Sequence, residues 1–190
     1  MKKIILIFII GLLISQNNEM NNLSITLKVF EPYIGKTYKG EFSESTPEKP
    51  VFDVQYWERI LNGNGIKITH SVNDGEYGGE SIIMWDLKSE SLQSWYFTTA
   101  GFYTEATVTF EDKKVISIEK VTGNQNGITK VKSIVQLLTN GEMHTKAQYF
   151  QEGKWIDGHE IYYKEDPGEK ICKTCGDVVM YCKCYEDMYK

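Results

Sequence analysis

Three basic side chains between residues 59 and 159 have the types and surroundings needed for chemistry. His70 lies on the apolar face of a candidate strand, just before a turn at residues 73–75. His159 follows an Asp-Gly pair on the last candidate strand, and Arg59 is the only arginine of the chain. A histidine in such a position can donate a proton, bind haem iron or be a buried side chain with satisfied hydrogen bonds. An inward arginine would pair with a ligand carboxylate, whereas at the rim of the fold it would form a salt bridge.

Acid–base catalysis would need two polar groups close together with shifted pKa values. In an enzyme acting on a small hydrophobic substrate, His70 or Glu58 would be the acid–base group. The acidic turn at residues 74–80 lacks the oxygen-ligand spacing of an EF-hand. The sequence also contains no nucleophile elbow, phosphate-binding glycine loop or zinc-protease motif. An enzyme is therefore the alternative to a binding protein, and no catalytic residue is assigned.

The four cysteines are confined to a C-terminal tail, residues 167–190, which begins at a Pro-Gly pair. Cys172, Cys175, Cys182 and Cys184 have the spacing C-x2-C-x6-C-x-C. Four thiolates can close a tetrahedral zinc site, and the first pair has the spacing of a zinc knuckle. An exported chain favours disulfides instead, for which four cysteines allow three pairings. In either state the tail could contact a protein partner, which makes an interaction module a further alternative.

The residues between these groups predict β-strands separated by short turns. Gly, Asn and Asp mark the turns because they adopt positive φ at low cost, and the strands are rich in β-branched and aromatic residues. A short helix is expected at residues 26–33. The candidate strands are residues 36–42, 51–62, 65–72, 79–86, 91–98, 102–110, 114–122, 127–137, 142–150 and 154–163. This pattern favours an all-β fold, an up-and-down antiparallel barrel of about ten strands, over a β-sandwich, because a barrel hides both edges.

Alternation along the strands predicts which side chains point into the barrel. The even positions of residues 65–72 and of residues 102–110 form apolar faces. A barrel of this size has room for a small molecule, unless its aromatic side chains fill the interior. The residues expected to bind a ligand are His70, Trp85, Tyr96, Phe102, Thr104, Arg59 and His159. Ile68 and Trp155 are also expected to point inward.

Two stretches of the chain carry a family resemblance. The segment YIGKTYKGEF at residues 33–42, after a short helix, resembles the opening of lipocalin-like barrels of the calycin superfamily. The segments HSVNDGEYGGE (70–80), WD (85–86) and YFTTAGFYT (96–104) resemble a bacterial lipocalin-like family of unknown function. The resemblance implies a ten-stranded barrel with an internal pocket, and no established reaction. Tyr38 stands where haem-binding nitrobindin-like barrels usually have tryptophan, and Gly176 excludes a c-type haem motif, so the sequence argues against haem.

The N-terminal segment predicts export. Residues 1–16 have the basic start and short apolar run of a signal peptide. The run is shorter than a typical bilayer span, so we expect no stable membrane insertion after cleavage. The net charge of −5 argues against a nucleic-acid partner. The sequence thus predicts a signal peptide, a barrel over residues 25–165 and the cysteine tail, in an exported protein that binds a small apolar or amphipathic molecule.

Overall fold

The computed structural model describes residues 22–73, 75–121, 127–169 and 172. The predicted signal peptide and most of the cysteine tail lie outside these residues. Within them, no helix is both long and apolar enough to span a bilayer. The elements are η1 (Ile25–Tyr33), β1 (Thr37–Phe42), β2 (Phe52–Ile60), η2 (Leu61–Gly63), β3 (Gly65–Val72), β4 (Tyr77–Asp86), β5 (Ser91–Thr98), β6 (Tyr103–Glu111), β7 (Lys114–Lys120), β8 (Ile128–Leu137), β9 (Met143–Gln151) and β10 (Lys154–Glu165).

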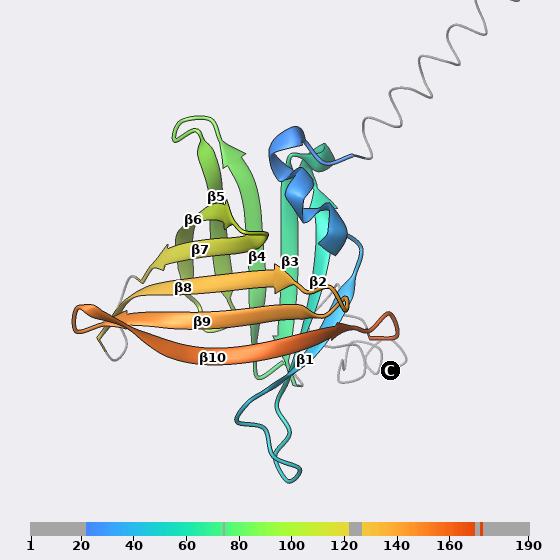
Figure 1. Cartoon of the computed structure of the whole chain (residues 1–190), viewed down its shortest axis with the longest axis vertical. Helices are drawn as coiled ribbons and strands as arrows, with labels where there is room; N and C mark the ends of the chain where they lie inside the picture. The colour runs from blue at the N-terminus through green and yellow to red at the C-terminus, as the bar shows by residue number, and fades with distance from the viewer. Residues whose placement is uncertain (1–21, 74, 122–126, 170–171, 173–190) are drawn as a thin grey trace, which may run out of the picture.

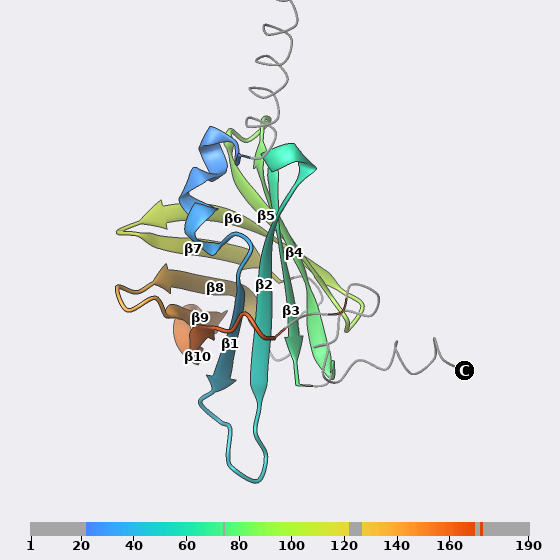
Figure 2. The ribbon, with the colours of Figure 1, turned by 90° about the vertical axis from the view of Figure 1, so that its right-hand side faces the viewer.

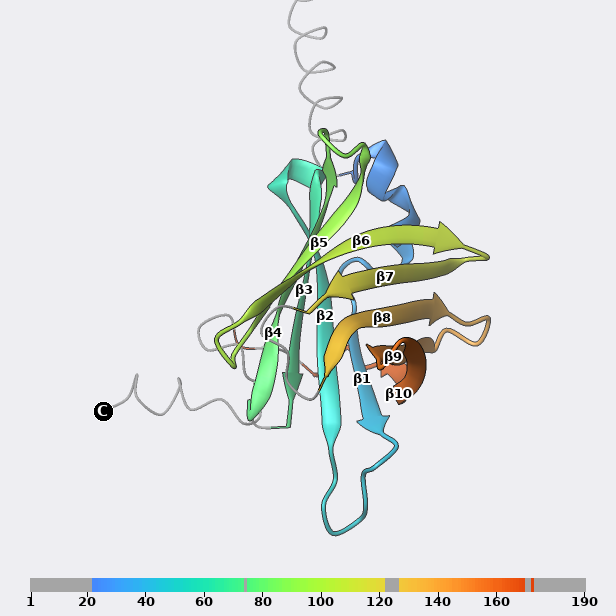
Figure 3. The same ribbon diagram turned by 90° about the vertical axis from the view of Figure 1, so that its left-hand side faces the viewer.

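The ten strands form one closed antiparallel barrel, as predicted (Figure 1). Each strand pairs with its neighbours in sequence, and β1 pairs with β10 to close the sheet. The strands β7 to β10 cross in front of β2 to β5 at a steep angle, as Figure 3 shows from another side. Because closure pairs every strand on both sides, the barrel leaves no open sheet edge.

The short N-terminal helix packs against one end of the barrel interior (Figure 2). It is a 3-10 helix with Pro32 inside it, and it coincides closely with the helix expected at residues 26–33. Leu27 and Phe30 have no exposed surface. The ring of Phe30 lies edge-on to Phe110, with 5.2 Å between centroids, and Tyr33 stacks on Trp57 at 4.8 Å. These contacts fill the helix end of the interior with aromatic and aliphatic side chains.

A β-bulge reverses the alternation within β10. Its register with β9 shifts between Asp157 and Glu160, where β10 carries one residue more than its partner. A Cβ at Gly158 would lie 2.5 Å from the ring of Tyr149, so the bulge brings the backbone against that ring. As a result, Asp157 contacts side chains on the outer face, whereas His159 lines the interior. In a regular strand these two residues would lie on the same face.

The outer face of the barrel carries the ordinary surface charges. Glu58 forms a salt bridge with Lys67 at 2.9 Å, and Lys67 also reaches Glu80 at 3.2 Å. His144 stacks on the exposed Tyr162, with 4.4 Å between ring centroids. Glu58 therefore does not supply a group to the barrel interior, and the acid–base role considered for it is not supported.

Candidate functional site

The barrel encloses a cavity of about 810 Å³ at the end away from η1. This volume lies within the usual range of small-molecule sites. Apolar side chains of the core, among them Trp57 and Ile83, form its inner boundary. Serine hydroxyls from four strands also face it, and its aromatic lining is Phe42, Trp57, Tyr77, Tyr96, Phe102, Tyr149 and Tyr163. The arrangement suits a molecule that is largely apolar and carries a few polar groups.

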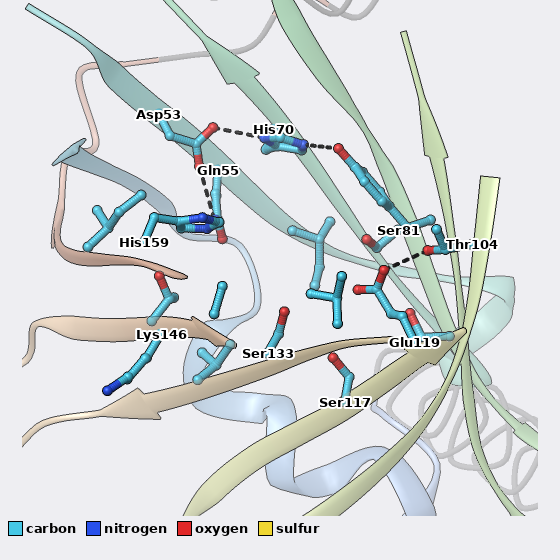
Figure 4. Close-up of a pocket in the computed structure, with 18 of the residues that line it drawn as sticks. Asp53, Gln55, His70, Ser81, Thr104, Ser117, Glu119, Ser133, Lys146 and His159 are labelled. Atoms are coloured by element: carbon cyan, nitrogen blue, oxygen red, sulfur yellow. Dashed lines mark hydrogen bonds and ion pairs between the residues drawn. The ribbon is translucent and has the colours of Figure 1, made fainter. Parts of the chain in front are cut away.

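A chain of hydrogen bonds runs along one wall of this cavity (Figure 4). The ring of His70 lies between Asp53 and Tyr96, with Nδ1 2.8 Å from Asp53 Oδ1 and Nε2 2.7 Å from the Tyr96 hydroxyl. Tyr96 in turn donates to the Tyr77 hydroxyl at 2.9 Å. Since Nδ1 faces a carboxylate, it carries a proton, and Asp53 fixes the orientation of the imidazole. The chain therefore connects a buried carboxylate to the partly exposed Tyr77.

The carboxylate of Asp53 is held from several sides. Its side chain is almost fully buried, and Oδ2 accepts hydrogen bonds from the Tyr163 hydroxyl at 2.7 Å and from Gln55 Nε2 at 3.0 Å. Together with His70, these donors satisfy a group whose burial would otherwise be costly. Burial and the adjacent Asp53 raise the pKa of Tyr163 well above its ordinary value, so this hydroxyl stays protonated.

The position of His70 in this chain limits what it can do chemically. A catalytic imidazole would present Nε2 to a substrate, but here that nitrogen already contacts the Tyr96 hydroxyl. Burial raises the pKa of Tyr96 far above its ordinary value, so Tyr96 does not ionise near neutral pH. The wall is thus a fixed set of hydrogen-bonding groups, with Asp53 as its anchor.

Glu119 on β7 forms a second polar point in the cavity. Its carboxyl accepts a hydrogen bond from the Thr104 hydroxyl at 2.8 Å, across the β6–β7 pair. Burial raises the pKa of Glu119 above its ordinary value, and the hydrogen bond from Thr104 only partly offsets this effect. In Figure 4, Glu119 projects into the cavity near Ser117 and Ser133.

His159 forms a third polar point, beside the bulge of β10. Its Nδ1 lies 3.0 Å from the Tyr149 hydroxyl, and its ring lies 5.6 Å from that of Phe42, centroid to centroid. Burial lowers the pKa of His159, although Glu44 and Asp53 act in the opposite direction. The imidazole is therefore neutral near neutral pH and offers a hydrogen-bonding nitrogen to a ligand.

The structure separates the predicted ligand-binding residues into two groups. Five of them line the cavity: His70, Tyr96, Phe102, Thr104 and His159. The other two do not: Trp85 packs against the apolar core, and Arg59 Nε donates to the carbonyl of Asn22 at 3.2 Å, where the chain enters η1. Contact with a ligand stays a prediction for all seven.

Ile68 lines the cavity as expected, but the inward orientation expected of Trp155 is wrong. Lys132 Nζ lies 4.4 Å above the Trp155 ring, which also packs edge-on against Phe150 outside the cavity lining. The bulge explains the error, because the extra residue inverts the alternation that links position 155 to position 159.

Several polar residues of the cavity were not predicted from the sequence. They are Asp53, Gln55, Tyr77, Glu119, Tyr149 and Tyr163. The signal that could have found them is alternation: Asp53 and Gln55 share a face with the buried Trp57, and Glu119 shares a face with Val115. A charged residue on such a face has to find partners within the barrel.

The cysteine predictions fall mostly outside the described residues. Cys172 is buried, and Cys175, Cys182 and Cys184 lie beyond the part of the chain that the structure describes. Among the described residues, no group of three or more His, Cys, Asp or Glu side chains is placed to hold a metal ion. The zinc and disulfide alternatives for the tail both stay predictions.

Comparison with known proteins supports the fold. No family model matches the chain. No curated protein matches it either. Among solved structures, the chain is similar to Rv2717c from M. tuberculosis, with a TM-score of 0.54 and 10% sequence identity, over 76% of this chain and 99% of that one. A porin-like protein from Bacteroides uniformis aligns with a TM-score of 0.23 and 7% identity, over 69% of this chain and 96% of the other. At such low identity, the likeness to Rv2717c shows a shared barrel fold.

Proposed function

We propose that this protein is an exported lipocalin-like binding protein that holds a small amphipathic molecule inside the barrel. The observation that carries the proposal is the cavity of about 810 Å³, whose aromatic walls bear hydrogen-bonding groups at three separate points. Apolar surface supplies affinity through burial, and the fixed polar groups orient the ligand. An aromatic core that filled the barrel would leave no such volume.

A cavity-filling variant tests this function. The uncharged fluorophore N-phenyl-1-naphthylamine serves as the probe, and its emission on titration reports binding. Ser133 faces the cavity from the middle of β8, so Ser133→Trp places an indole in the space that a ligand would occupy. We expect saturable binding to the wild type and at least about ten-fold weaker binding to this variant, since the apolar contact is lost.

The matched control is Ile134→Trp, which adds the same side chain at the next residue of β8, outside the cavity lining. This variant should bind the probe with wild-type affinity. Circular dichroism of both variants shows whether the barrel is intact, because overpacking alone costs about 1–3 kcal/mol. Equal binding by wild type and Ser133→Trp would contradict an internal site.

The proposal of export rests on the N-terminal pattern and has its own test. Intact-mass measurement of the protein from its native host should give a chain that lacks about 16 residues, as expected after cleavage of a signal peptide. A mass that includes the entire N-terminus would contradict cleavage. The same native spectrum reports any zinc ion or disulfide in the cysteine tail through its mass.

A further inference from the structure

The two carboxyl groups that line the described cavity differ in how many partners they have. The carboxylate of Asp53 is paired with His70 and accepts two further hydrogen bonds. For Glu119, the Thr104 hydroxyl is the one donor among the described residues. A carboxylate has about four acceptor positions, so most of those of Glu119 are available on its cavity side. A partly buried carboxylate with so few partners is costly to ionise, and a cation brought by a ligand would offset that cost.

None of the basic side chains in the described cavity lining forms an ion pair with the Glu119 carboxyl. Lys146 directs its amine to Asp157 on the outer face, at 3.1 Å. Burial lowers the pKa of His159, which keeps that imidazole neutral, and His70 is engaged with Asp53. The described cavity therefore holds a carboxyl that lacks a cationic partner, with no free cation that could attract an anionic ligand.

Two surrounding features also favour a cation. Tyr96 and Tyr149 line the same cavity as Glu119, and the charge of Glu119 contributes to the raised pKa of both hydroxyls. An ammonium group gains from contact with aromatic faces as well as from the carboxylate. Glu44, in the turn between β1 and β2, raises the pKa of Tyr149 and of His159 through its charge, so it adds negative potential near these two cavity residues.

We propose that the ligand is an amphiphilic amine whose ammonium group pairs with the Glu119 carboxylate, while its apolar part lies against the floor formed by Trp57 and Ile83. This inference rests on the proposed binding function and adds the chemical class of the ligand. The ammonium would donate to the carboxylate oxygens, with the hydroxyls of Ser117 and Ser133 as further acceptors nearby. Fatty acids should bind weakly, because their carboxylate would lie against the carboxylate of Glu119.

Three ligands of equal chain length separate charge from apolar contact. Dodecylamine, 1-dodecanol and dodecanoate each compete with N-phenyl-1-naphthylamine at neutral pH and below their critical micelle concentrations. For the wild type we expect dodecylamine to bind at least about ten-fold more tightly than dodecanol, and dodecanoate to bind most weakly. The wild-type comparison tests the preference even if a variant fails to fold.

The variant Glu119→Gln removes the charge and keeps the shape of the side chain. We expect it to bind amine and alcohol within about two-fold of each other, with dodecanol affinity close to that of the wild type. The control is Glu105→Gln on the exposed face of β6, which removes an equal charge outside the cavity and should keep the preference.

Two outcomes overturn the inference alone: equal binding of amine and alcohol by the wild type, or a preference for amine that survives Glu119→Gln. In both cases dodecanol still binds and the proposed binding function stands. If the probe does not bind to the wild type, and direct titration detects no binding of any of the three ligands, the proposed function fails and the inference fails with it.

Discussion

The two ends of the barrel interior are built from the same strands but differ in what occupies them. At the η1 end, Phe30 and Trp57 are almost fully buried and pack ring against ring. At the opposite end, the strands carry Asp53, His70 and Tyr96, which hydrogen-bond along the wall and leave a cavity. The comparison shows that the strands set which side chains face inward, whereas the helix sets how far the interior is filled.

The largest expected difference is in the free energy of unfolding when phenylalanine is replaced by alanine at each of the two ends. Phe30→Ala removes a ring with no exposed surface, and we expect a loss of about 3–5 kcal/mol in the free energy of unfolding. Phe102→Ala acts at the cavity, where the ring is 45% exposed, and should cost below about 1 kcal/mol. Urea unfolding measures both values. Equal losses would mean that the two halves do not differ in packing.

The hydrogen-bond chain offers a second comparison, between its buried and its exposed end. Asp53→Asn removes a charge that accepts three hydrogen bonds and should lower the free energy of unfolding by about 2 kcal/mol. Tyr77→Phe removes one hydroxyl at the partly exposed end and should cost about 0.5 kcal/mol. Chemical denaturation with an unchanged m-value tests this order. A larger loss for Tyr77→Phe would show that Asp53 is not the anchor.

The smallest expected effect is the pH dependence that Glu119, in the cavity, gives to the free energy of unfolding. Burial raises the pKa of Glu119, so the folded state holds this proton more tightly than the unfolded state. The stability of the wild type relative to Glu119→Gln should therefore fall as pH rises from the ordinary pKa of 4.5 through the raised folded pKa, and stay constant above it. Urea unfolding at several pH values measures this difference. A relative stability that rises with pH would contradict the raised pKa.

The fold and the inward faces could be predicted because antiparallel strands alternate with a period of two. Ile66, Ile68 and His70 illustrate this, since a single parity places them all inside. Alternation does not indicate where along the barrel axis an inward residue lies, at the η1 end or at the cavity. Trp85 shares the face of cavity residues yet packs in the apolar core, and Arg59 lies near the start of η1.

Two other parts of the site could not be predicted, for different physical reasons. The bulge at Gly158 depends on one extra residue relative to β9, and a single strand does not show its partner's register. Asp53 was missed because a charged residue between apolar ones is usually exposed, whereas here His70 on β3, Tyr163 on β10 and Gln55 on its own strand satisfy it. Of these donors, Tyr163 reaches Asp53 only when β10 closes against β1.

The packing of η1 into one end of the barrel has a kinetic consequence. Because η1 and the apolar core fill one end, a molecule in the cavity would enter and leave at the opposite end. Exchange of one ligand for another would then require departure before arrival, and residence time would be set at the rim, where Tyr77 and Phe102 are partly exposed. Substitutions there should change the association and dissociation rates of a ligand, which stopped-flow fluorescence with the probe measures.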